Sequence, residues 1–518
     1  FLLRLMGIQW GLPDERHYFP YHPDESTIVL IASNMASSGD WNPHFFNYGS
    51  LPLYLTAFLL KGAEATGLLS LQEPHWAMAY LLARLWVALL GTATVGVLYL
   101  LGRELGGPAV GWGAAGWLAV MPLHVVHSHY ATVDVPLTFL LLMALWMLMG
   151  YLKSPHPLRA TGVGLFLGLG TATKYNAAAL WLVMAPCLGW PWRRVRCWNA
   201  ALLAFGGAFL LACPYALLDM GTFARDLHFE LRHARYGGTL DFVGTPPGWI
   251  YHLTVGLPTG LGLWGTFLGL AGILWMASHG EPKRWALAGA FLVQYLLIGS
   301  SAEKFIRYLM PLLPLMALGG AEGTWRGWGL PGLRPWAWAL GGAVVAGNLA
   351  MSLAYDALLA GRDVRDQAAD WAWQHIPPGS LVGLTEEPYF FTPPLWPYNG
   401  GLKSRQWLFA EQDKFRYRFI ITGWVEERLR RNAPEWFLIS EFEYAPRLRL
   451  GNEGMMRFWR ALEEDYELVW RAKTWPCLGP LCFRRSQVPH DWRYPNPEIR
   501  IYRRRSPMGQ GFEQLPQV

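Results

Sequence analysis

Long apolar runs recur through the first two thirds of the chain, whereas the last third alternates between short apolar and polar segments. A helix that crosses a bilayer needs about 20 mostly apolar residues. The pattern therefore predicts an α-helical polytopic membrane body over residues 1–355 and a C-terminal extracytoplasmic α/β domain over residues 356–518.

The apolar runs give ten candidate transmembrane helices. They lie at residues 77–102, 109–127, 132–151, 160–174, 176–190, 198–218, 249–277, 285–300, 308–321 and 335–355. Residues 1–12 are too short to cross a bilayer, so we interpret them as the outer end of a first helix that begins upstream of Phe1. This interpretation predicts about eleven crossings in all.

Two shorter segments within residues 13–75 are predicted to lie along the membrane surface. The first follows Asp24, has apolar residues at helical spacing and stops at Gly39. The second, residues 51–69, contains Lys61 and Glu64 among apolar positions. If the second segment crossed the membrane, every later loop would change sides and the basic turns would lie outside. We therefore predict two interfacial helices that frame a lateral opening for a lipid.

The loops between spans differ in charge on alternate sides. One set is short and basic, with cations such as Arg103, Lys153, Arg159, Lys283 and Arg284. Because short cytoplasmic loops collect Lys and Arg, this set is predicted to be cytoplasmic. We therefore predict a multi-pass protein of the cell (inner) membrane with a cytoplasmic N-terminus and an extracytoplasmic C-terminal domain.

The opposite set of loops carries the residues with candidate chemistry, which are Asp24, Glu25, Asp134, Lys174, Arg232, His233, Lys304 and Arg307. Ionisable residues inside a membrane are costly and usually functional. Their shared side predicts one site on the outer face. The net charge of +6 is assigned to cytoplasmic turns and anionic headgroups, so it does not indicate nucleic acid binding.

The segment His22-Pro23-Asp24-Glu25 places two carboxylates just before the first interfacial helix. An Asp in this position can simply cap a helix, and Glu25 in the first turn suits the helix dipole. Asp134 at the start of another span has the same alternative. Two carboxyl sites at one membrane depth, one of them beside a lateral opening, favour a functional site over two unrelated caps.

Several short motifs occur in an order that resembles the bacterial family 39 glycosyltransferases, which are similar to protein O-mannosyltransferases and to the lipid A aminoarabinose transferase. These motifs are His-Pro-Asp-Glu at residues 22–25, Asn-Tyr-Gly-Ser-Leu-Pro-Leu-Tyr at 47–54, His-Ser-His-Tyr-Ala-Thr-Val-Asp-Val-Pro at 127–136, Gly-Thr-Ala-Thr-Lys-Tyr at 170–175, Pro-Tyr-Ala-Leu-Leu-Asp at 214–219 and Arg-Tyr-Leu-Met-Pro at 307–311. The resemblance covers most of the membrane body.

The resemblance implies a GT-C fold and transfer of a sugar from a polyprenyl-phosphate carrier to a protein or glycan acceptor outside the cytoplasm. The acidic motif of the family falls on Asp24 and Glu25, and its second acidic position falls on Asp134. A carboxylate must take the proton of the attacking hydroxyl, and Asp24 is the expected general base. A phosphate leaves as a stable anion, so cations replace the general acid of a glycosidase.

The cations expected to bind the carrier phosphate are Lys174, Arg232, Lys304 and Arg307, with His22, His129, Tyr130, His233 and Tyr308 as further substrate-binding residues. Lys174 has the alternative of snorkelling to headgroups, and Arg307 that of an interface anchor. A divalent cation is an alternative source of positive charge. Asp24 and Asp134 would suit Mg²⁺ or Mn²⁺, whereas the spacing of His124, His127 and His129 does not fit one helical face.

The loop at residues 219–248 is interpreted as a solvated amphipathic helix, with a lid hinged at Gly237 and Gly238 as the alternative. In the C-terminal domain we expect helices at 365–375 and 452–466, strands at 381–384, 418–422 and 436–440, and a terminal strand followed by a flexible tail over 501–518. Cys477 and Cys482 flank a Gly-Pro turn, which predicts a disulfide in an oxidising exterior, with two free thiols as the alternative.

Two other classes of protein share this membrane pattern. A transporter or flippase usually has repeated halves and charges near the midplane, and no internal repeat is evident here. A non-catalytic subunit that keeps the scaffold of a glycosyltransferase is the other alternative. The acidic positions favour an enzyme, while the donor sugar and acceptor depend on the shape of the pocket.

Overall fold

The computed structural model describes residues 1–14, 16–17, 19–71, 76–189, 194–395, 415–485 and 488–505. The contacts divide the chain into two units. The first contains residues 1–12, 22–361 and 475–493, and the second contains residues 13–21, 362–474 and 494–518. The boundary expected after Tyr355 lies inside a helix that continues to Ala360, and residues 475–493 belong to the first unit.

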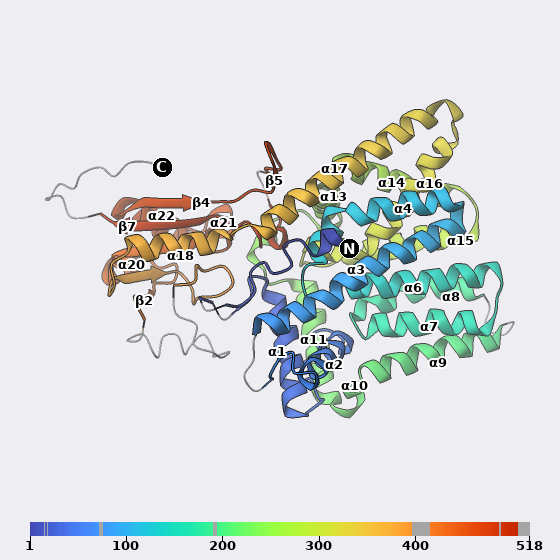
Figure 1. The fold of residues 1–518 in the computed structure, drawn as a ribbon, viewed down its shortest axis with the longest axis horizontal. Coiled ribbons are helices and arrows are strands. Elements are labelled where there is room, and N and C mark those ends of the chain that lie inside the picture. The colour runs from blue at the N-terminus through green and yellow to red at the C-terminus, as the bar shows by residue number, and fades with distance from the viewer. Residues whose placement is uncertain are drawn as a thin grey trace. The chain divides into compact units, whose positions relative to one another are not determined.

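The first unit is a bundle of helices (Figure 1). Its elements are α1 (Pro23–Ser38), α2 (Leu51–Ala65), α3 (Trp76–Gly106), α4 (Pro108–Val120), α5 (Pro122–His127), α6 (Asp134–Lys153), α7 (Pro157–Thr171), α8 (Trp181–Leu188), α9 (Val195–Ala212), α10 (Tyr215–Leu218), α11 (Met220–Tyr236), α12 (Gly248–Tyr251), α13 (Leu257–Leu261), α14 (Leu263–Ser278), α15 (Pro282–Gly299), α16 (Leu313–Arg326) and α17 (Arg334–Ala360). Short helical turns η2 (Tyr175–Leu180) and η6 (Ile306–Leu312) precede α8 and α16.

Four helices in the described residues are long and apolar enough to cross a membrane, and one bent pair would make a fifth. The expected number of about eleven crossings therefore remains a prediction. The bent pair occupies the expected single span at 249–277, where the axis turns by 115°. The break falls at Gly262, whose φ of 75° lies in the left-handed region that an α-helix does not use.

A second interruption divides the expected span at 109–127. Helix α4 ends at Val120 and α5 begins at Pro122. Proline has no backbone N–H and cannot continue the hydrogen-bond ladder of the preceding turn, so the chain starts a new helix there. The two predicted surface segments form α1 and α2, which pack against each other and against α3.

The second unit is the α/β domain expected from the sequence. Its elements are α18 (Val364–His375), β1 (Leu381–Leu384), β2 (Arg418–Ile421), α20 (Glu426–Asn432), β3 (Trp436–Ser440), α21 (Glu441–Leu450), α22 (Glu453–Asp465), β4 (Tyr466–Ala472) and β7 (Ile499–Arg504). The strand order is β2-β1-β3-β7-β4. Strand β1 runs parallel to both its neighbours, and β7 runs antiparallel to β3 and β4.

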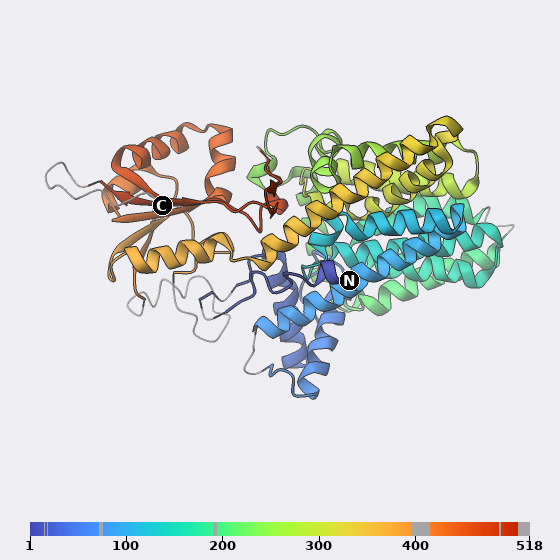
Figure 2. The ribbon, with the colours of Figure 1, turned by 45° about the horizontal axis from the view of Figure 1, so that its top comes forward.

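Successive side chains of the central strand β3 point to opposite faces of this sheet. Phe437 joins the buried cluster formed with α20, α21 and α22, while the adjacent Trp436 contacts Trp371 of α18. The sheet is therefore covered on both faces (Figure 2). The expected tail after β7 extends over residues 506–518, which lie outside the described part of the chain.

The disulfide expected from the sequence is present. Cys477 and Cys482 are bonded and pair across the small hairpin of β5 (Cys477–Leu478) and β6 (Leu481–Cys482). The other three cysteines, Cys187, Cys197 and Cys213, are free thiols.

Candidate active site

Arg307 stands at the centre of the candidate site. Its guanidinium lies close to three carboxylates: Nη2 is 2.9 Å from Asp24, Nε is 3.7 Å from Asp134 and Nη1 is 3.8 Å from Asp491. The side chain is only 6% exposed. The two acidic positions singled out in the sequence thus share one cation, although 110 residues separate them along the chain.

Lys174 adds a second cation to this cluster. Its Nζ is 2.9 Å from Oδ1 of Asp134 and lies 4.1 Å from the centre of the Tyr308 ring. Arg307 stacks on the neighbouring Phe305 at 4.0 Å. Aromatic faces attract cations and exclude water from one side of them, so both charges are held in fixed positions beside the carboxylates.

Helix starts bring the carboxylates to this point. Asp24 follows Pro23 in the first turn of α1, and Asp134 is the first residue of α6. The N-cap residues are His22 and Val133, so neither Asp takes the capping position that the sequence left open. Both side chains instead pair with cations from other elements, while their negative charge still suits the positive end of a helix dipole.

The members of the cluster differ in exposure. The side chain of Asp24 is 22% exposed, whereas that of Asp134 is only 2% exposed. A group that exchanges a proton with a substrate must be reachable from outside the protein. Asp24 meets this requirement, and Asp134 is placed to hold Arg307 and Lys174.

Glu25 has a different environment from its neighbour Asp24. Its buried carboxylate receives two hydrogen bonds from Arg84, at 2.8 and 2.7 Å, and one from the N–H of Ala131 at 2.7 Å. Arg84 also donates to the carbonyls of Ile8 and Trp10. Neither Glu25 nor Arg84 has any exposed side-chain surface, so this pair ties α1, α3 and the N-terminal segment together.

His22, His129 and Tyr130, expected to bind substrate, are all buried side chains. The His22 ring lies 4.4 Å from the Tyr130 ring, and both nitrogens of His129 face backbone carbonyls, those of Val125 and Met6. Burial and the positive charge of Arg307 lower the pKa of His22 well below its usual range. The His22 ring is therefore neutral at pH 7.

Lys304 and His233 contact residues other than Asp24 and Asp134 in the contacts described. Lys304 donates to the carbonyl of Phe242 and the hydroxyl of Thr245. His233 is 3.7 Å from Glu303, and Arg232 is exposed on α11. Of the expected site residues, the structure thus gathers Asp24, Asp134, Lys174, Arg307 and Tyr308.

Two further residues join the site without having been singled out from the sequence. Asp491 accepts hydrogen bonds from the backbone N–H groups of Ile306 and Arg307, which fixes the start of η6. Tyr48 lies near enough to Asp24 that this carboxylate, together with burial, raises the pKa of the phenol far above its usual range. Tyr48 belongs to one of the motifs that carry the resemblance, whereas no local pattern marks Asp491.

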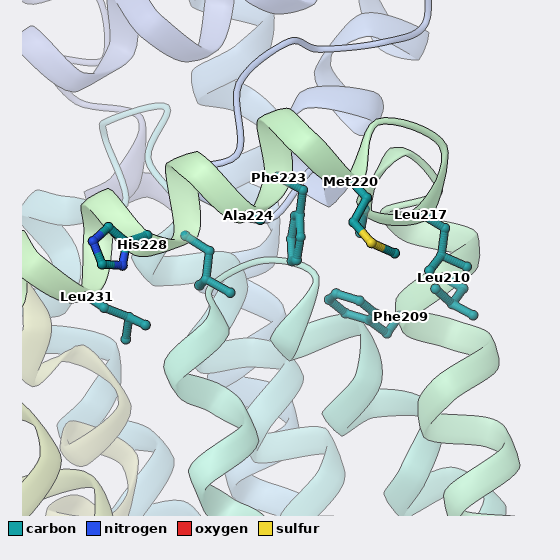
Figure 3. A pocket seen from close by; sticks show the side chains of 10 residues that line it. Phe209, Leu210, Leu217, Met220, Phe223, Ala224, His228 and Leu231 are labelled. Atoms are coloured by element: carbon teal, nitrogen blue, oxygen red, sulfur yellow. The ribbon is translucent and has the colours of Figure 1, made fainter.

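An apolar groove lies between α9, α10 and α11 (Figure 3). It encloses about 420 Å³ and is lined by residues that include Phe209, Leu210, Leu217, Met220 and Phe223. Phe223 also packs edge-to-face on Phe46, two residues before Tyr48. The groove therefore approaches the loop that carries Tyr48.

The two residues expected to hold a divalent cation, Asp24 and Asp134, are both paired with basic side chains, so the metal site stays a prediction. Asp24 pairs with Arg307, and Asp134 pairs with both Arg307 and Lys174. Within the described ranges, no group of three or more His, Cys, Asp or Glu side chains has the spacing to hold a metal ion. Arg307 and Lys174 supply positive charge at this site.

Part of the chain matches the model of a known protein family. Residues 79–218 match the family described as dolichyl-phosphate-mannose-protein mannosyltransferase. This confirms the expected resemblance to mannosyltransferase-like membrane enzymes over that part of the chain, which includes Asp134 and Lys174. A search among curated proteins found no match.

Solved structures give more extensive alignments at low identity. The archaeal oligosaccharyltransferase AglB from Archaeoglobus fulgidus, in complex with an inhibitory peptide and a dolichol-phosphate, is 12% identical over 96% of this chain and 76% of its own, with a TM-score of 0.49. ArnT from Cupriavidus metallidurans, bound to undecaprenyl phosphate, is 16% identical over 96% of both chains, also with a TM-score of 0.49. The arabinofuranosyltransferase AftD from Mycobacteria is 15% identical over 97% of this chain and 39% of its own, with a TM-score of 0.43.

Proposed function

We propose that this protein is a membrane glycosyltransferase that moves a sugar from a polyprenyl-phosphate carrier to an acceptor hydroxyl on the outer face of the membrane. The observation that carries the proposal is the meeting of Asp24 and Asp134 at Arg307, with Lys174 beside them. The family that matches residues 79–218 is described by a dolichyl-phosphate-mannose donor, which belongs to the same chemical class.

In the proposed reaction, the acceptor oxygen attacks the anomeric carbon of the sugar while the bond from that carbon to the phosphate oxygen breaks. Asp24 takes the proton of the acceptor hydroxyl, and the polyprenyl phosphate leaves as an anion. Arg307 and Lys174 stabilise the negative charge that grows on the phosphate. Because the leaving group is already a stable anion, it needs no general acid.

Arg307 has two successive roles in this scheme. Without donor, its Nη2 holds Asp24 at 2.9 Å and keeps the carboxylate in place. A donor phosphate competes for the same guanidinium, for which a phosphate is a good bidentate partner. Donor binding then loosens the pair and leaves Asp24 able to accept a proton. Asp134 and Asp491 keep Arg307 in place through this exchange.

We assign a positioning role to Glu25 in place of the catalytic role expected from the motif, because both its oxygens already bind Arg84. The apolar groove beside α11 supports a donor with a prenyl tail, since its lining is almost entirely hydrocarbon. A protein or glycan acceptor would approach from the outer side. Lys304 and Arg232, expected to bind the carrier phosphate, and His233 remain candidates for substrate contacts.

The proposal is tested with Asp24→Asn and Arg307→Gln, using Asp40→Asn as a matched control. Asp40 is an exposed carboxylate in the same outer loop, hydrogen-bonded only to nearby loop residues among the contacts described. Purified protein is incubated with polyprenyl-phosphate-linked sugars, and release of polyprenyl phosphate is measured with a panel of protein and glycan acceptors. Binding of undecaprenyl phosphate is measured separately.

Loss of a general base lowers turnover by about 10²–10⁴-fold. We expect this loss for Asp24→Asn with lipid binding retained, and weakened lipid binding for Arg307→Gln, while Asp40→Asn behaves as wild type. If Asp24→Asn turns over at the wild-type rate, Asp24 is not the general base. Unchanged turnover and unchanged lipid affinity in Arg307→Gln would reject the phosphate role.

A further inference from the structure

A second pocket with a distinct chemistry lies where the ends of four helices meet. It encloses about 630 Å³ between the C-terminal ends of α3 and α6 and the N-terminal ends of α7 and α15. Its charged residues are Arg103, Lys153, Arg159 and Lys283, together with Glu104. Four cations and one carboxylate leave a net charge of +3.

This pocket is separate from the site around Arg307. Helix α6 begins with Asp134 at that site and ends with Lys153 at the pocket. Its 20 residues, at 1.5 Å per residue, span about 30 Å, which equals the hydrocarbon thickness of a bilayer. The pocket thus lies at the opposite membrane surface, which the distribution of basic loops predicts to be cytoplasmic.

Contacts around the rim hold part of this charge in place. Arg159 donates through Nη1 to the carbonyls of Gly150 and Ser154, at 2.6 and 2.9 Å, and so bridges the turn between α6 and α7. Lys283 pairs with Glu104 at 3.1 Å. Arg103 and Lys153 are exposed, so their charges can be neutralised by a ligand without breaking a buried contact.

The wall of the pocket changes from charged to apolar along the helices. Leu100 and Trp146 precede the charged ends of α3 and α6 by about one or two turns, and Met147 lies beside them. A soluble phosphate would use only the cations. A molecule that carries both a phosphate and hydrocarbon chains would use the whole wall, and Trp is favoured at this depth of a membrane.

We infer that this pocket binds the phosphate headgroup of an anionic phospholipid, with the start of its acyl chains against Leu100 and Trp146. Basic pockets between transmembrane helices on the cytoplasmic side are suited to such headgroups because their charge and depth match the lipid. The inference does not depend on the proposed transfer reaction. It assigns a role to four cations that the active site does not use.

The test removes one charge at a time with Arg103→Gln and Lys153→Gln. Arg196→Gln is the matched control, because Arg196 is an exposed cation at the start of α9 that does not line the pocket. Apparent affinity is measured from thermal stabilisation of the detergent-purified protein titrated with phosphatidylglycerol, cardiolipin, phosphatidylcholine or inorganic phosphate.

Removal of one cation near an anionic headgroup weakens binding by about fivefold. We expect this change for both pocket variants with the anionic lipids, wild-type affinity for the control, and no saturable effect of phosphatidylcholine. Equal weakening by all three variants would mean diffuse attraction and would overturn the site. If inorganic phosphate but no lipid stabilises the protein saturably, and Lys153→Gln weakens that effect, the pocket binds a soluble phosphate. This result would overturn the assignment to a phospholipid.

Discussion

Replacing Glu25 should lower the stability of the protein, whereas replacing the adjacent Asp24 should lower its transfer activity. Glu25→Gln leaves the Arg84 guanidinium buried without its counter-charge, since neither side chain of the pair is exposed. Breaking such a pair from one side costs about 3–5 kcal/mol. Asp24→Asn removes one ion pair of a partly exposed carboxylate, while Arg307 keeps Asp134 and Asp491 nearby. We expect a cost of at most about 1.5 kcal/mol there.

The assay compares thermal unfolding and transfer activity for both variants in the same detergent. Glu25→Gln should lower Tm by about 3–5 °C, and the protein that remains folded should retain transfer. Asp24→Asn should unfold close to wild type and lose transfer. The double variant Glu25→Gln, Arg84→Met should recover part of the lost stability, because no unpaired charge is then buried.

Two results would refute this reasoning. If Asp24→Asn unfolds at a lower temperature than Glu25→Gln, the buried pair does not carry the stability assigned to it. If folded Glu25→Gln has lost transfer to the same extent as Asp24→Asn, Glu25 takes part in the chemistry and the division of roles between the two residues is wrong.

Three other predictions concern close packing, the disulfide and pH. Gly49→Ala would place a Cβ 2.0 Å from the carbonyl oxygen of Ala172. We expect this clash to displace the turn before Lys174 and to lower transfer about 10- to 100-fold. The control Gly62→Ala, whose Cβ meets nothing within 4 Å, should transfer at the wild-type rate. Reduction of Cys477–Cys482 should cost about 2 kcal/mol for so short a loop and make both thiols alkylatable in a mass-spectrometric assay; alkylation before reduction would contradict the bond. Burial raises the pKa of Glu443 to about 8, so its ionised form is penalised only in the folded protein, and Tm should fall as the pH rises from about 5 to 8. Glu443→Gln should flatten that slope, and an unchanged slope would assign it to another group.

Much of the organisation could be predicted because it depends on local patterns. Apolar runs indicated the helical body, and the positions of α1 and α2 followed from their shorter mixed segments. The spacing of Cys477 and Cys482 indicated the disulfide. Alternation of short helices and strands indicated the α/β domain, since a strand and a helix expose apolar residues at different periods.

The breaks in helices were less predictable because hydropathy does not record backbone geometry. Residues 249–277 are apolar throughout, yet the helix turns by 115° at Gly262. The antiparallel partner β7 of β3 also lies about 60 residues further along the chain. Pairing over such a distance depends on how the whole domain closes, which no local window contains.

The sequence by itself determined which residue types gather on one side of the membrane body, because loop charge and helical period are local properties. Only the tertiary structure decided their roles. Adjacent residues on a helix point about 100° apart, so Asp24 and Glu25 face different neighbours, Arg307 and Arg84. Asp491 reaches Arg307 from 184 positions away. Packing brings these groups within a few ångströms of one another. The partner and the burial that each carboxylate obtains in this way give the partly exposed Asp24 a different role from the buried, structural Glu25.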